Sequence, residues 1–187
     1  NGHVLKYDPA GNLIATWDVF QDQPPMDIPV THGLAIDRER QVLYVAAYKS
    51  QADEGRILRM NLWGNVLGSW PSSKPSGLAV DKDGLLVYAT EYDNGTVRVF
   101  DPTGVEVASW GGLTRPHDCA VAPNGTVYVT DTGNDAICLY TSRGEFIACW
   151  DADGSDDWQF QKPTGITVGL YGYVYVADSA NHRLLKF

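Results

Sequence analysis

Short stretches of alternating hydrophobic and polar residues follow one another along the whole chain. Residues 126–132 (TVYVTDT) and 173–179 (YVYVADS) are typical, being rich in Val, Tyr and Thr. Turn-forming residues separate the stretches, as in Asp101-Pro102-Thr103-Gly104. Alternation with period two between such turns predicts β-strands, and no stretch sustains the 3.6-residue period of a helix. An all-β fold with essentially no helix is therefore expected.

The strand pattern itself repeats. Four segments align at the start of the repeat, namely VTHGLAID (30–37), KPSGLAVD (74–81), RPHDCAVA (115–122) and KPTGITVG (162–169). Each is followed by further β-rich runs, and a run ending in tryptophan closes three of the units and the first part of the chain. The tryptophans at this equivalent position are Trp17, Trp70, Trp110 and Trp150. A period of roughly 40–47 residues is typical of a propeller blade, whose four strands are termed A to D here.

The repeat predicts a β-propeller of four-stranded antiparallel blades, about four of which are present. The expected units are a half blade (1–28), three blades (29–70, 71–110 and 111–150) and a partial blade (151–187). This gives one strand more than four whole blades, which favours part of a six-bladed ring. The remainder would come from residues outside this sequence or from another chain. A four-bladed ring with one redundant strand and a self-associating half-ring are the alternatives. Since a small sheet cannot bury its faces alone, the recurring tryptophan is predicted to pack between blades.

Charge and hydropathy narrow the class of partner. The formal net charge is −9, and the chain has no cluster of Lys and Arg of the kind that binds nucleic acid. Its apolar stretches are too short to predict a transmembrane segment. The expected partner is therefore a protein, a peptide or a glycan. Asn94-Gly95-Thr96 and Asn124-Gly125-Thr126 match the glycosylation sequon, although each is also a good tight turn. With the acidic surface, these sequons favour a secreted or extracellular glycoprotein.

Cysteines and acidic residues offer weaker signals. Cys119, Cys138 and Cys149 are odd in number and lack metal-type spacing. Cys138 and Cys149 are expected on neighbouring strands, diagonally related on one face, so that a disulfide and two buried thiols both remain open. The aspartates of residues 151–157 form either a cation-binding loop or a solvated one. Asp37 and Asp81 close A strands and are predicted to accept backbone hydrogen bonds in the following turns.

The junctions between the B and C strands carry a family motif. Residues 178–184 read Asp-Ser-Ala-Asn-His-Arg-Leu, which resembles the NHL repeat, named after an Asn-His-Leu run at this place. Residues 131–137 show the same motif with Asp135 in place of the histidine. The Pro-x-Gly-Ile/Leu-x-Val pattern at 75–80 and 163–168 is also similar. The resemblance implies an NHL-type propeller, a fold that hosts binding proteins and a few enzymes and so implies no single activity.

Two A strands begin with a histidine, His32 and His117, in blades that are not adjacent. This arrangement resembles the peptidyl-α-hydroxyglycine amidating lyases, six-bladed propellers that hold a divalent metal, usually zinc, with three such histidines. The resemblance implies that His32 and His117 are zinc ligands and that Tyr92 assists deprotonation of the substrate hydroxyl. It also implies that Asp118 and the backbone carbonyl of Leu34 serve a structural calcium.

The chain departs from that lyase pattern in two respects. Thr132 stands near the place of a family arginine, and a third strand-head histidine is missing, since His3 and His182 fall on C strands or their loops. Two imidazoles bind zinc weakly without further ligands. His32 and His117 therefore either form a metal site or simply hydrogen-bond a loop at the head of their strands. The sequence favours a binding scaffold, with a metal-dependent lyase as the alternative.

Overall fold

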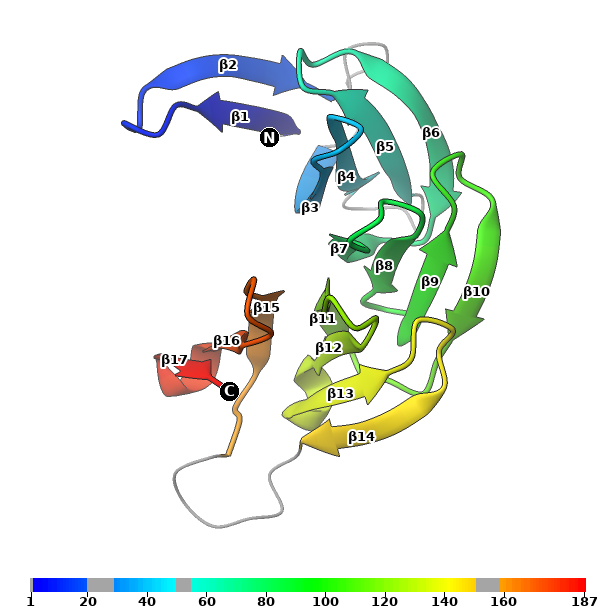
Figure 1. Ribbon diagram of the computed structural model, residues 1–187, viewed down its shortest axis with the longest axis vertical. Coiled ribbons are helices and arrows are strands. Elements are labelled where there is room, and N and C mark those ends of the chain that lie inside the picture. The colour runs from blue at the N-terminus through cyan, green and yellow to red at the C-terminus, as the bar shows by residue number, and fades with distance from the viewer. Residues whose placement is uncertain (1, 20–28, 50–54, 151–158) are drawn as a thin grey trace.

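The computed structural model describes residues 2–19, 29–49, 55–150 and 159–187. Within these ranges it contains seventeen β-strands and two short 3-10 helices. Figure 1 shows the sheets standing side by side in an open arc around a common centre, from β1 and β2 at one end to β15–β17 at the other. The expected all-β propeller arrangement is confirmed. No helix in the described residues is long and apolar enough to cross a membrane.

Each sheet is antiparallel and follows chain order. The first sheet has two strands, β1 (His3–Tyr7) and β2 (Leu13–Asp18). The first four-stranded blade comprises β3 (Pro29–Asp37), β4 (Val42–Lys49), β5 (Gly55–Asn61) and β6 (Val66–Ser72). The second comprises β7 (Pro75–Val80), β8 (Val87–Glu91), β9 (Thr96–Phe100) and β10 (Glu106–Trp110). The third comprises β11 (Pro116–Val121), β12 (Val127–Asp131), β13 (Ala136–Tyr140) and β14 (Phe146–Trp150). The last sheet has three strands, β15 (Pro163–Val168), β16 (Val174–Asp178) and β17 (Arg183–Lys186).

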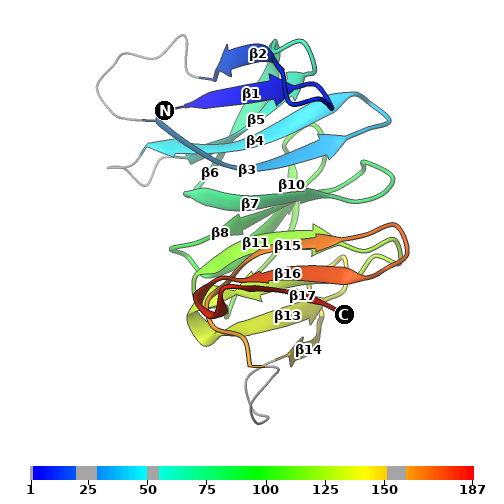
Figure 2. The same cartoon turned by 90° about the vertical axis from the view of Figure 1, so that its left-hand side faces the viewer.

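The A strands β3, β7, β11 and β15 lie nearest the centre of the arc. Figure 2, seen from the open side, shows them running one beside another. Because equivalent positions of these strands converge on one axis, residues far apart in the sequence meet at the strand heads. This convergence is what places the candidate site.

The tryptophans at the outer ends of the blades pack between blades, as predicted. Trp70 lies 6.0 Å from Tyr44 of its own blade and 5.7 Å from Phe100 of the next, measured between ring centroids. It also covers Gly104 in the next C–D turn, where a Cβ atom would lie 2.7 Å from the indole. The same contact joins Trp17 to Gly64 and Trp110 to Gly144.

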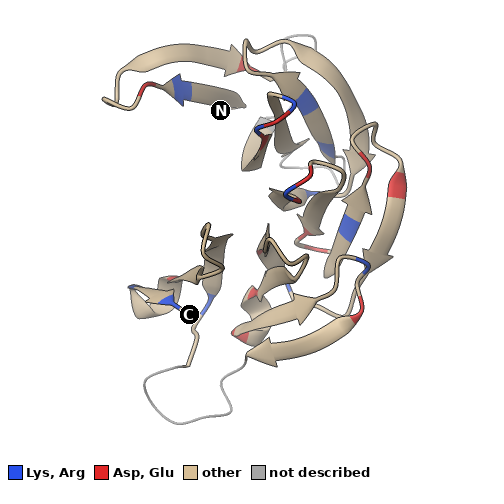
Figure 3. Cartoon of the chain, viewed as in Figure 1, with Lys and Arg blue, Asp and Glu red and all other residues tan. Residues whose placement is uncertain are grey.

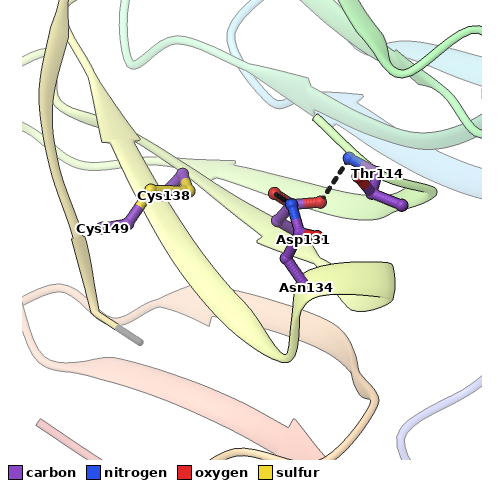
Figure 4. Close-up of a disulfide and its surroundings, with 5 residues drawn as sticks. All are labelled: Thr114, Asp131, Asn134, Cys138 and Cys149. Atoms are coloured by element: carbon purple, nitrogen blue, oxygen red, sulfur yellow. Dashed lines mark hydrogen bonds between the residues drawn. A yellow bond between two sulfur atoms is a disulfide. The ribbon is translucent and has the colours of Figure 1, made fainter. Parts of the chain in front are cut away.

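Buried carboxylates hold the loops that enter three of the sheets. Asp131 accepts a hydrogen bond from the backbone N–H of Thr114 at 2.6 Å and another from the Asn134 amide (Figure 4). Asp178 does the same for Gln161 and Asn181, while Glu91 takes this role in the second blade. The Asp and Asn of the NHL-like motif thus fix the start of the A strand. 3-10 helices follow two of these carboxylates, at Thr132–Asn134 and Ser179–Asn181.

The A–B turns form as predicted. Asp37 Oδ1 accepts from the backbone N–H of Arg40 at 3.0 Å, and Asp81 Oδ1 accepts from that of Leu85 at 2.7 Å. The aspartate-rich segment 151–157 lies outside the described residues.

Cys138 and Cys149 form a disulfide between β13 and β14 (Figure 4). Here the expected geometry was wrong. The two cysteines are direct partners across the hairpin, with Cα atoms 4.1 Å apart, and are not diagonally related. The register shifts between Leu139 and Tyr140, close to the C–D turn, and counting back from the turn without this shift misplaces the pair. Cys119 is a buried free thiol.

Candidate functional site

The heads of the A strands bring His32 and His117 together. Their ring centroids are 5.7 Å apart, with Ser76 of the intervening blade between them in the order of the blades. The Ser76 hydroxyl lies 3.5 Å from His32 Nδ1. In each A strand the pairing with the B strand shifts register across this position, between Thr31 and Leu34 in the first blade and between Pro116 and Cys119 in the third. Such irregularities re-aim side chains, which explains how strand residues come to face the axis.

Two tyrosines complete the cluster. Tyr92, directly after β8, meets the His117 ring edge to face at 6.2 Å. Tyr48, in β4, lies 5.7 Å from the His32 ring. Tyr92 was predicted from the sequence, whereas Tyr48 was missed. Alignment of the repeats could have identified Tyr48, because it occupies the same place in the first blade as Tyr92 in the second.

These rings surround one pocket with a volume of about 370 Å³. Its lining consists of His32, Tyr48, Lys74, Ser76, Tyr92, Asp93 and His117. The volume falls in the range of small-ligand sites, roughly 300–1,000 Å³. The ion pair between Lys74 and Asp93, 2.7 Å long, supplies the charged groups of this lining.

Both imidazoles favour the neutral form. Burial lowers the pKa of His32, although the residue as a whole is exposed. Burial also lowers the pKa of His117, the nearby His32 adds to this effect, and a hydrogen bond with the backbone of Thr164 opposes it. Neutral imidazole is the form that ligates metals and accepts hydrogen bonds. The pair is therefore suited to either role at neutral pH.

The fit to a zinc ion is partial. Zn–N bonds of about 2.0–2.1 Å allow two imidazoles on one ion to have centroids at most roughly 6 Å apart, and this pair satisfies that limit. Within the described ranges, however, no group of three or more His, Cys, Asp or Glu side chains could hold a metal ion. Thr132, near the place of the family arginine, donates its hydroxyl hydrogen to the carbonyl of Pro163 in the next blade.

Asp118 and Leu34 line a second cavity of about 410 Å³ among the A strands. The Asp118 carboxylate accepts hydrogen bonds from the backbone N–H groups of Cys119 at 2.9 Å and Ile166 at 3.1 Å. Burial raises the pKa of Asp118 to about 6, against the effect of these two bonds. Asp118 thereby links β11 to β15. The structure brings both predicted calcium ligands to one space, and calcium binding stays a prediction.

The two sequon asparagines are exposed and take part in turns. The Asn94 amide donates to Glu91 at 3.1 Å, and Asn124 Oδ1 accepts from the backbone N–H of Thr126 at 3.0 Å. Their turn role is thus established, and glycosylation stays a prediction. Charged residues are scattered over the blades in Figure 3, without a continuous basic stripe among the described residues.

Comparison with protein families matches parts of the last two sheets to a known repeat. A family model described as NHL repeat covers residues 113–138 and 160–187. These two segments match the NHL repeat. The first of them includes the A strand that carries His117 and Asp118, so the candidate site is built partly from NHL sequence.

Two relatives match part of the chain. A Caenorhabditis elegans protein named as a probable peptidyl-α-hydroxyglycine α-amidating lyase is 32% identical over 82 residues, 41% of this chain and 23% of the relative. NHL-repeat-containing protein 4 of Mus musculus is 35% identical over 72 residues, 38% of this chain and 52% of the relative. The chain therefore spans about a quarter of one relative's length and about half of the other's.

Solved structures share the architecture. A Bacteroides caccae protein of unknown function aligns with 100% of this chain at a TM-score of 0.76 and 14% identity, and 71% of that protein is covered. Virginiamycin B lyase from Staphylococcus aureus aligns with 100% of the chain at a TM-score of 0.67 and 14% identity, with 62% of the lyase covered. At such low identity these matches show the fold alone.

Proposed function

We propose that this NHL propeller is a binding protein whose axial pocket receives a segment of a peptide partner. The observation that carries the proposal is the meeting of His32, Tyr92 and His117, from three separate blades, at one pocket of about 370 Å³. Side chains that only hydrogen-bonded their own loops would have no need to share a space. The pocket lies at an axis position, where ligands of ring-shaped folds gain contacts from several blades at once.

The chemistry of the lining supports a peptide over other ligands. Neutral imidazoles and phenol hydroxyls both donate and accept hydrogen bonds, as the backbone of a peptide does. The aromatic faces of Tyr48 and Tyr92 add apolar contact area. The Caenorhabditis elegans relative is named for an activity on peptidyl substrates, which agrees with this choice.

Selection from a library of peptides with free carboxy termini tests the proposal. Wild-type protein should enrich a set of related peptides, whereas a His32→Gln/His117→Gln variant with an unchanged melting temperature should not. Trp63→Ala, at a side chain that is 77% exposed on a C–D turn, is the matched control and should enrich the same set. Equal enrichment on the double variant would place the binding surface elsewhere.

A metal-dependent lyase is the second candidate, favoured by the convergence of the lyase-like residues His32, His117 and Tyr92. In this case the two histidines would hold zinc together with a ligand from beyond the described residues. Bound zinc would lower the pKa of the substrate hydroxyl. Tyr92, which is in edge-to-face contact with His117, would take that proton. Asp118 and the Leu34 carbonyl would serve calcium from the neighbouring cavity.

Zinc content and turnover separate the candidates. The full-length protein should carry about one equivalent of zinc and convert a peptidyl-α-hydroxyglycine to the peptide amide and glyoxylate, with Tyr92→Phe slowing turnover. Full-length protein with less than about a tenth of an equivalent of zinc and no glyoxylate release would leave binding alone.

We also propose that the protein acts outside the cell. The two sequons lie on exposed turns, and a disulfide such as Cys138–Cys149 persists in oxidising compartments. Protein recovered from the medium of eukaryotic cells should shift in mass on deglycosylation, and Asn124→Gln should remove part of that shift. An unshifted wild-type protein would contradict glycosylation.

A further inference from the structure

Among the described residues, the pocket contains an ion pair that the proposed function does not use. Lys74 and Asp93 meet at 2.7 Å, and their side chains are 26% and 52% exposed. Among the described residues that line the pocket, Lys74 is the one permanent cation, since both histidines favour the neutral form.

The backbone holds Lys74 in an unusual conformation beside the site. It has a φ of +45° and precedes Pro75, which starts β7, so its Cα lies two residues before Ser76. A positive φ is uncommon for a residue other than glycine and merits an explanation. Arg115 and Lys162 stand at the equivalent places of the next two sheets, with φ of +55° and +49°. The conformation alone is thus a feature of the repeat.

The carboxylate partner, in contrast, is specific to the second blade. Asp93 follows Tyr92 directly, and the equivalent residues in the next two sheets are Gly133 and Ala180, which carry no charge. Arg115 and Lys162 are exposed and are not among the residues that line the pocket. The blade that lies between the two histidine blades is therefore the one in which a basic residue at this place is directed to the pocket.

We infer that Lys74 is the anion-binding residue of the axial pocket, and that the ligand presents a carboxylate which takes the place of Asp93. This inference rests on the proposed function and specifies the ligand class. Asp93 is more than half exposed, and ion pairs of exposed side chains contribute little to stability, so the exchange costs little. A ligand carboxylate between Lys74 and the Tyr92 hydroxyl would gain charge-assisted hydrogen bonds, which are stronger than neutral ones.

The sharpest test substitutes Lys74 and Asp93 separately, because the two substitutions should change ligand affinity in opposite directions. Binding of benzoylglycine and of its amide to the wild-type protein is measured by calorimetry, since the pair differs in one charge. Lys74→Gln should weaken binding of the acid about tenfold, as expected for the loss of one charge-assisted hydrogen bond, and should leave binding of the amide unchanged. Asp93→Asn should tighten binding of the acid several-fold, because it removes a carboxylate that competes with the ligand for Lys74. Arg115→Gln and Lys162→Gln remove the same charge at equivalent backbone positions. Each should change the affinity for either ligand by less than twofold.

Each alternative outcome is distinct. Equal weakening of the acid by Lys74→Gln and Asp93→Asn would mean that the ion pair is structural, and the inference would fail while the pocket function stood. The inference would fail in the same way if the acid and the amide bound the wild type equally. If neither binds, the proposed function and the inference fail together. Acetate as competitor identifies the source of the carboxylate: displacement at concentrations similar to those of benzoylglycine would support a small acid as ligand over a peptide terminus.

Discussion

The rim and the axis of this propeller use the same repeat in opposite ways. At the rim, the outer strand of each four-stranded blade carries a tryptophan at the equivalent position, as at Trp70, Trp110 and Trp150. At the axis, the residue at the head of the A strand changes from blade to blade, from His32 to Ser76 and then to His117. Both positions repeat with the same backbone geometry, so geometry does not explain the difference.

The neighbours of each position do explain it. Trp17, Trp70 and Trp110 each meet the same partner, a glycine in the C–D turn of the next blade, so a single residue type solves each of these interfaces. The axis positions instead face one shared pocket. Identical residues there would present the same chemical group from every blade, whereas the proposed peptide ligand is not symmetric. A residue that recurs at the same position in successive blades thus indicates a packing role. A position whose residue differs between blades indicates a role in binding. Variants at the two regions should separate stability from binding.

The largest effect is expected at the rim. Trp70→Ala should lower the free energy of unfolding by about 3–5 kcal/mol, because it empties an interface between two blades. Trp70→Phe should cost less, since it keeps a ring and removes an indole N–H that is buried without a partner among the described residues. Urea denaturation followed by fluorescence gives these values. A loss below about 1 kcal/mol for Trp70→Ala would mean that the rim does not hold the blades together.

A smaller, pH-dependent effect on the free energy of unfolding is expected at Asp118, which links two A strands near the axis. Asp118 has a pKa near 6 in the folded protein, against 3.8 ordinarily, so the folded state binds more protons between these values. Wild-type stability should therefore fall as pH rises from about 4 to 6, by up to about 3 kcal/mol from this residue. Asp118→Asn lacks this dependence, so its stability relative to wild type should rise over the same window.

Paired denaturation curves of wild type and Asp118→Asn from pH 4 to 7 measure the effect. Asp83→Asn, at an exposed turn, controls for the loss of one negative charge. A constant difference between wild type and Asp118→Asn would show that the carboxyl group titrates normally despite its burial.

The sequence predicted the fold more fully than the site. Period and turn residues were sufficient to place the strands and to assign the rim tryptophans, because both depend on local pattern and on repetition. The pairing of Cys138 with Cys149 was misjudged, because a register shift next to a turn leaves no clear mark in the sequence. Lys74 was overlooked because its role depends on Asp93, nineteen residues away, and on a pocket shared by three blades.

The smallest change in stability, and the largest in binding, is expected at the axis. His32→Gln and His117→Gln should each alter the free energy of unfolding by less than about 1 kcal/mol, since glutamine keeps hydrogen-bonding groups at a partly open pocket. Each should nevertheless abolish ligand binding at the pocket, because each removes one of the two imidazole rings whose centroids lie 5.7 Å apart there. Ser76→Ala, at the same strand position between them, should leave stability within the same limit and weaken binding less. Denaturation and calorimetry on the three variants test this order. If the histidine variants unfolded as readily as Trp70→Ala, the axis would be a packing site like the rim. The variation of the A-strand residue between blades would then no longer indicate a binding role.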